Sequence, residues 1–144
     1  MEPTTKKSSV WSKLVAIVLI LIGAFLFYIS LDANKYSAQV RVIEGAGKIG
    51  LNPTTERLDF GDLSPGASAT RLVTIENATK IPMFVFTMRL GGITDLIDQD
   101  KNFFVLAPHK KATIEFEAYM PASAPVGETI TGRVFLFKIP GPWK

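Results

Sequence analysis

An uncharged, apolar segment near the N-terminus constrains what this chain can fold into. It runs from Leu14 to Leu31 and reads LVAIVLILIGAFLFYISL. At about 1.5 Å rise per residue, a helix of this length covers about 27 Å, close to the thickness of a bilayer's hydrocarbon core. A helix that is apolar on every face has no stable place on a small soluble domain. Because Trp11 and Tyr28 lie near its ends, where aromatic rings favour headgroups, we predict a transmembrane helix over residues 14–31.

A cleaved secretory signal is the alternative interpretation, since the segment follows Lys6, Lys7 and Lys13. The apolar part of a signal peptide is usually about 7–15 residues long and ends at a cleavage site between small residues. Here the apolar run is longer, and the nearest candidate site, at residues 36–38, begins with the large side chain of Tyr36. An uncleaved anchor is therefore favoured, and a lipoprotein signal is excluded because the chain has no cysteine.

The expected orientation follows from the basic residues on the two sides of the helix. Three lysines lie within the first thirteen residues, whereas Lys35, Arg41 and Lys48 follow the helix at wider spacing. Positively charged flanks favour the cytoplasmic side. We therefore expect residues 1–13 to form a short cytoplasmic tail and the C-terminal part to be extracytoplasmic.

The rest of the chain is large enough for one domain. We expect residues 32–37 to form a linker and residues 38–144 to form the domain. The formal net charge of the chain is +3, and no basic cluster extends beyond Lys110-Lys111, so nucleic-acid binding is not indicated. The absence of cysteine removes thiol chemistry and thiolate metal sites.

Apolar residues in the second part of the chain alternate with polar ones, which is typical of strands with one buried and one solvent-exposed face. In the stretch 111–119, for example, Ile114, Phe116 and Ala118 alternate with threonine and glutamate. Proline and glycine separate such stretches. The predicted strands cover residues 38–43, 57–60, 70–76, 83–90, 103–106, 111–119 and 129–139, with one helical turn within 93–99. We therefore predict an all-β domain, an antiparallel β-sandwich of about seven strands.

Two of these strands, at residues 83–86 and 134–137, are apolar on both faces, although the outer face of a sandwich is normally polar. Either residues 93–99 or the C-terminal tail cover them, or their outward residues form a docking surface for a partner or a second copy. Trp143 either folds back over Phe135 or Phe137, or stays exposed as an anchor for a partner. The possible docking face comprises Met83, Val85, Phe135, Phe137 and Trp143.

The same pattern predicts the core and the position of the tail. With an odd number of strands, the tail at residues 140–143 is expected at the end of the sandwich opposite the start of the first strand. The expected buried residues are Phe60, Val73, Ile75, Phe84, Phe86, Phe104, Ile114, Phe116, Val134 and Leu136.

Four motifs follow one another in a recognisable order. Residues 58–66 read LDFGDLSPG, 71–77 read RLVTIEN, 104–109 read FVLAPH, and 125–134 read PVGETITGRV. This order resembles the immunoglobulin-like domains of the ASH and major-sperm-protein type, as found on prokaryotic surface proteins, over about residues 58–136. The resemblance implies an immunoglobulin-like sandwich that serves as a scaffold for protein contacts. His109 departs from the family pattern, which typically has glycine after the proline.

Few residues are available for metal binding. His109 with Met88 and Met120 is the one conceivable set for a soft copper ion, but a single histidine without cysteine favours a solvated turn histidine and core methionines. We predict no metal and no cofactor.

The acidic residues also give no catalytic or calcium-binding prediction. Asp95, Asp98 and Asp100 are spaced like part of a calcium loop, but the glycine and the closing glutamate of such loops are missing, which favours a solvated loop. Glu115 and Glu117 share the exposed face of one strand, where they are expected to keep it soluble rather than act as a hydrolytic pair.

Asn77-Ala78-Thr79 matches the acceptor pattern for N-glycosylation, whereas Asn52-Pro53-Thr54 is disqualified by its proline. Asn77 is therefore a possible glycosylation site. The favoured alternative is a turn asparagine that bonds its own backbone.

These observations predict a membrane-anchored, extracytoplasmic protein-binding or structural module of the cell envelope, and not an enzyme. The expected partners are the lipid bilayer, through residues 14–31, and a protein or a second copy, with no nucleic acid and no small-molecule substrate. The alternative is a subunit of a surface filament or pilus-like assembly joined by β-strand addition, in which residues 38–43 leave their own domain.

Overall fold

A computed structural model describes residues 10–45, 47, 49–50 and 58–143. The chain forms two compact units that meet between Asp32 and Ala33. Some residues used in the predictions lie outside the described part of the chain. They are Lys6, Lys7 and Lys48, on which the expected orientation partly depends, the disqualified acceptor pattern at residues 52–54, and the first residue of the strand predicted at 57–60.

The described part of the first unit, residues 10–32, is the helix α1 (Val10–Asp32). It extends beyond the predicted segment at both ends, and its residues are exposed along almost the whole length. Its most apolar 18-residue window has a mean hydropathy of 2.9, so the helix is long and apolar enough to cross a membrane. Trp11 and Tyr28 are both exposed near its ends.

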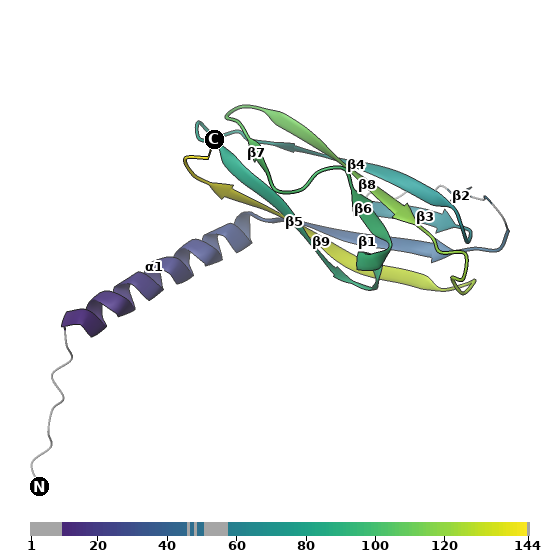
Figure 1. Cartoon of the computed structure of the whole chain (residues 1–144), viewed down its shortest axis with the longest axis horizontal. Coiled ribbons are helices and arrows are strands. Elements are labelled where there is room, and N and C mark those ends of the chain that lie inside the picture. The colour runs from purple at the N-terminus through teal and green to yellow at the C-terminus, as the bar shows by residue number, and fades with distance from the viewer. Residues whose placement is uncertain (1–9, 46, 48, 51–57, 144) are drawn as a thin grey trace, which may run out of the picture. The chain divides into compact units, whose positions relative to one another are not determined.

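The second unit contains two β-sheets (Figure 1). Six strands form one sheet in the order β2-β3-β1-β9-β5-β7, and three form the other in the order β4-β8-β6. The strands are β1 (Asn34–Val42), β2 (Ile49–Gly50), β3 (Leu58–Leu63), β4 (Ser68–Glu76), β5 (Met83–Gly91), β6 (Ile97–Gln99), β7 (Phe104–Leu106), β8 (Lys111–Tyr119) and β9 (Thr129–Pro140). The predicted all-β domain after an apolar helix is thus confirmed.

Several details differ from the prediction. β1 begins at Asn34, so most of the segment expected to be a linker belongs to this strand. β1 and β3 run parallel, so the sandwich is not wholly antiparallel. The expected helical turn at residues 93–99 consists of a short 3₁₀ helix, η1 (Gly92–Asp95), followed by β6, which pairs with β8.

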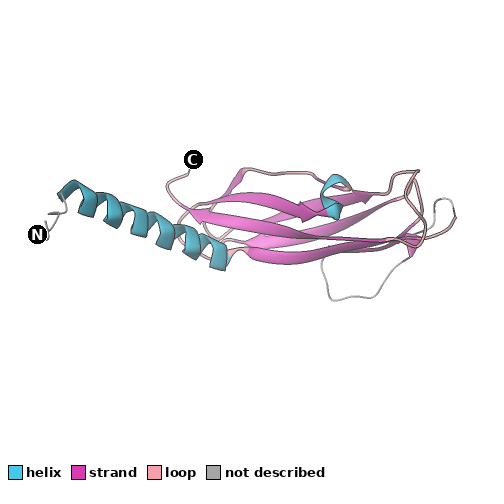
Figure 2. Ribbon diagram, turned by 90° about the horizontal axis from the view of Figure 1, so that it is seen from below, coloured by secondary structure: helices cyan, strands magenta, loops and turns pink. Residues whose placement is uncertain are grey.

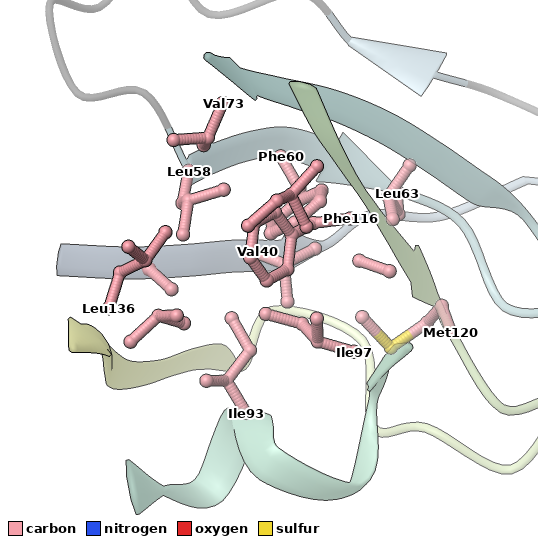
Figure 3. Packing of buried hydrophobic residues seen from close by; sticks show 14 of the residues in the cluster. Val40, Leu58, Phe60, Leu63, Val73, Ile93, Ile97, Phe116, Met120 and Leu136 are labelled. Carbon is pink, nitrogen blue, oxygen red and sulfur yellow. The ribbon is translucent and has the colours of Figure 1, made fainter. Parts of the chain in front are cut away.

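Apolar side chains from both sheets fill the space between them (Figure 3). Seven of the residues predicted to be buried are buried, and Phe104 is partly buried against the same cluster. The prediction was wrong for Phe84 and Phe86, because Met83, Val85 and Thr87 are the residues of β5 that are buried. The buried predicted residues are Phe60, Val73, Ile75, Ile114, Phe116, Val134 and Leu136.

The expected position of the C-terminal tail was also wrong. β1 and β9 are antiparallel neighbours, and Asn34, at the start of β1, is paired with Leu136 near the end of β9. The tail after Pro140 therefore lies at the end of the sandwich where β1 begins, as Figure 1 shows for this unit. In Figure 2, which turns the view by 90°, the strands run along the long direction of this unit.

Backbone geometry explains three positions of the motifs. Gly66 follows Pro65 in a turn and has φ of 80°, a conformation that favours glycine. A methyl group on Gly132 would lie 2.3 Å from Ile93 Cγ2, so β9 needs a glycine at this close approach. His109 has φ of 56°, so it occupies the left-handed conformation that glycine adopts most easily.

Candidate docking surface

The outward face of β5 and β9 carries aromatic residues instead of polar ones. On β9, Phe135 and Phe137 point outward, as predicted, because Val134 and Leu136 occupy the core. On β5, the structure reverses the predicted faces. Two residues of the predicted docking face, Met83 and Val85, lie in the interior, and Phe84 and Phe86 replace them on the outside.

Six rings form one continuous cluster, which we call the aromatic face. Phe86 stacks on Phe137 with 4.9 Å between the ring centroids and 17° between the planes. Phe137 continues to Phe135 at 6.2 Å, and Phe86 continues to Phe84 at 6.3 Å. The members are Phe84, Phe86, Phe103, Phe135, Phe137 and Trp143.

Phe103 is held in place by its neighbour Asn102. The Asn102 side chain accepts hydrogen bonds from the backbone N–H groups of Thr87 (2.8 Å) and Phe103 (3.0 Å). Phe103 itself has φ of 54°, which is rare for a bulky residue, and its side chain is 67% exposed. It nevertheless lies parallel to the Phe86 ring, with 6.2 Å between centroids and 4° between planes. Backbone strain of this kind is often found at functional sites.

Trp143 closes one end of the aromatic face. Its ring lies 5.7 Å from that of Phe84, and its Nε1 donates a hydrogen bond to the Ile139 carbonyl (2.8 Å). Trp143 therefore folds back over the outward face, as one of the two alternatives predicted. The ring that it contacts is Phe84, and not Phe135 or Phe137 as that prediction had it. The indole remains 39% exposed, so it caps the surface without hiding it.

Apolar and basic side chains border the rings. Met88, Leu90 and Val105 are exposed apolar residues on the outward faces of β5 and β7. Lys35 lies opposite Phe135 in the β1–β9 register, and Arg133 is the preceding outward residue of β9. An apolar centre with a positively charged edge suits a partner with apolar and acidic groups.

The candidate metal ligands do not come together. His109 lies in the turn before β8, whereas Met120 is fully buried after the other end of that strand, and Met88 is on the outward face of β5. Asp95 lies in η1 and Asp98 in β6. Within the part of the chain that the structure describes, no three histidine, aspartate or glutamate side chains gather as a metal site.

The acidic side chains of β6 and β8 are exposed, as predicted for a solvated surface. Asp98, Asp100, Glu115 and Glu117 line one shallow hollow. Desolvation acts to raise the pKa of the Asp100 carboxyl, but the Glu115 N–H and the ammonium of Lys101 outweigh it and hold the pKa below its ordinary value. A carboxylate stabilised in this way has no tendency to act as a general acid.

Asn77 is fully buried at the end of β4. Its Nδ2 donates to the carbonyls of Ile81 (2.8 Å), Leu106 (3.0 Å) and Ala107 (3.2 Å), and its Oδ1 accepts from the N–H and the hydroxyl of Thr79. The folded domain thus uses the nitrogen that a glycan would modify, which corresponds to the turn-asparagine alternative.

The aromatic face is the strongest candidate site on these geometric grounds. The sequence matches no protein-family model, and comparisons with curated proteins and with solved structures likewise find no match.

Proposed function

We propose that this chain is a membrane-anchored, extracytoplasmic protein-binding module of the cell envelope. In this proposal α1 spans the bilayer with its N-terminus in the cytoplasm, and the aromatic face binds a protein partner. One observation carries the proposal: six aromatic rings form a continuous cluster on the outward side of β5 and β9, whose inward residues pack into the core.

The position of the rings supports binding over packing. Side chains such as Phe60 and Phe116 are fully buried between the sheets, so the domain does not need the outer rings to form its core. Aromatic residues are enriched among interface hot spots, and residues on strands are held more rigidly than residues on loops. The ring contacts also order the surface before binding, which lowers the entropic cost of association.

We also propose an immunoglobulin-like sandwich of the ASH and major-sperm-protein type for the second unit. Phe60 is buried in the first motif, the Pro65-Gly66 turn has the expected positive φ, and His109 takes a glycine-like conformation. Domains of this type generally serve as scaffolds for protein contacts, which agrees with a non-enzymatic role.

The filament alternative finds no support in the strand order. β1, which would have to leave its domain, is a central strand between β3 and β9. Its removal would break both ladders and expose Ala38, Val40 and Val42, which are buried. We therefore favour docking through the aromatic face.

Site-specific photocrosslinking of the full chain in its native membrane tests the proposal. A photoreactive residue replaces Phe103 in one variant and Leu72 in the other. Leu72 is similarly exposed, at 61%, but lies on the other sheet. We expect one defined protein adduct from position 103 and none from position 72. Equal, diffuse labelling from both positions would contradict the proposed docking face.

A further inference from the structure

The fold gathers lysines that are scattered in the sequence at one end of the sandwich. We call this the basic end and define it as residues 33–36, 76–84, 104–112 and 136–143. The strand registers bring these segments together: Asn34 is opposite Leu136, and Met83 is opposite both Pro140 and Leu106. The Asn77 N–H donates to the Lys110 carbonyl (2.9 Å), which joins the remaining turns.

The two ends of the sandwich carry opposite charge among the described residues. The basic end has a net charge of +4 with His109 neutral, because it contains five lysines and one glutamate. We call the opposite end, at residues 41–44, 62–68, 91–96 and 119–129, the acidic end. It has one arginine and four acidic residues, which give a net charge of −3. The charged residues of the basic end are Lys35, Lys80, Lys110, Lys111, Lys138 and Glu76, and those of the opposite end are Arg41, Glu44, Asp62, Asp95 and Glu128.

Most of this positive charge is accessible to solvent. Lys35, Lys80 and Lys110 are exposed, and Lys111 is exposed although it forms an ion pair with Glu76 (3.1 Å). The exposed apolar side chain of Ile81 lies next to Lys80. A surface with both lysines and exposed apolar groups suits the headgroup region of a bilayer.

The chain connection between α1 and β1 is short. A single residue, Ala33, separates the last residue of α1 from the first residue of β1, which belongs to the basic end. Two peptide units span at most about 7 Å. If α1 crosses the bilayer, β1 must therefore begin within that distance of the end of the helix.

We propose that the basic end rests on the anionic headgroups of the bilayer that holds α1. This inference depends on the anchoring part of the proposed function. If the extracytoplasmic leaflet contains anionic lipid, each lysine close to it shifts the equilibrium toward the docked state about fivefold. The attraction acts over about 8 Å at physiological ionic strength, so it requires the close tether. The same surface repels the acidic end, and the domain stands with that end away from the membrane.

Energy transfer from a labelled residue to a headgroup-labelled lipid tests the inference on the full chain. The chain has no cysteine, so Ala78→Cys and Ala122→Cys each give one labelling site. Both positions are exposed, the first at the basic end and the second at the acidic end. The probes are vesicles of phosphatidylcholine alone and of phosphatidylcholine with phosphatidylglycerol.

We expect transfer from position 78, but not from position 122, to increase when phosphatidylglycerol is present and to fall again in high salt. The double variant Lys80→Gln/Lys110→Gln should reduce docking about twenty-fivefold, and Arg41→Gln at the acidic end should not change it. Equal transfer from position 78 in both vesicles overturns the inference. It is also overturned if the lysine changes alter transfer only between two labelled chains, which indicates a second copy as the occupant.

Flotation with neutral vesicles after alkaline carbonate treatment separates the two proposals. If the chain floats but shows no lipid-dependent energy transfer, the result supports the membrane anchor and contradicts docking of the basic end. If carbonate extracts the chain from the vesicles, the result contradicts both proposals.

Discussion

Phe86 and Phe137 lie directly opposite each other on antiparallel strands and stack outside the core. Stacked rings of this kind contribute about 0.5–1.5 kcal/mol beyond their buried area. The pair therefore stabilises the sheet and at the same time forms an ordered apolar surface on its outward face.

Polar replacement of this pair should separate binding from folding. Phe86→Thr and Phe137→Thr keep residues that suit strands, and we expect each to abolish the adduct from position 103 while the domain stays folded. Chemical denaturation of the full chain in detergent micelles, followed by circular dichroism, gives the stability. The coupling free energy between the two changes should be about 0.5–1.5 kcal/mol. Full retention of the adduct in both variants is the contradictory result.

Loss of a core ring should instead reduce the stability of the domain. Phe116 is fully buried between the sheets, so Phe116→Ala removes its contacts and leaves a cavity. We expect a loss of about 3–5 kcal/mol, which is a large part of the about 5–15 kcal/mol by which a small domain is stable. Leu72→Ala, at an exposed position of the neighbouring strand, is the control and should change stability little. An unchanged denaturation midpoint for Phe116→Ala would mean that the assignment of β8 is incorrect.

A change at Asn77 should reveal its structural role. Asn77→Asp keeps the shape but removes the donor that serves three carbonyl oxygens. We expect a loss of about 1–3 kcal/mol at neutral pH. The loss should be smaller in mild acid, because a protonated acid can still donate one hydrogen bond. Denaturation at two pH values measures the difference, and a variant as stable as the parent at neutral pH would rule out the role.

The close approach at Gly132 makes a specific stability prediction. In Gly132→Ala the new methyl group meets Ile93 Cγ2 at 2.3 Å and the Leu90 carbonyl oxygen at 2.5 Å. We expect a loss of about 1–3 kcal/mol or more, because a backbone atom cannot move aside easily. Gly92→Ala is the matched control, since its nearest neighbour is an ordinary contact at 3.5 Å. Similar stability of the two variants would contradict the close packing of β9 against β5 and η1 at this position.

Alternation in the sequence was sufficient where polar residues mark one face of a strand. In β8, Ile114 and Phe116 alternate with charged residues, and both were placed correctly in the core. In β5, residues 83–86 are all apolar, so alternation does not indicate which of them face the core. A shift of the assignment by one residue moves every side chain to the other face of the strand. Phe84 and Phe86 were consequently placed inside, although the smaller Val85 fills the core.

The candidate surfaces needed the three-dimensional fold for a related reason. Phe103 reaches the aromatic face through a positive φ and a bond to Asn102, and neither has a signature in a strand pattern. The lysines of the basic end come from four separate segments, of which Lys110-Lys111 is the one adjacent pair. Their proximity follows from pairing between distant strands.

The antiparallel pairing of β1 with β9 has a mechanical consequence. The ladder joins Asn34 to Leu136 and Arg41 to Thr129, so the anchored end of β1 and the tail of β9 lie side by side. Tension between the start of β1 and the tail after β9 separates the two strands from one end of the ladder, so their hydrogen bonds break one after another. Separation in this direction requires little force. If a partner binds the outward face of β9 and pulls it away from the membrane, as the proposed function implies, the two strands are pulled along each other. The hydrogen bonds of the ladder are then loaded together, so this direction of pulling meets more resistance than tension on the tail.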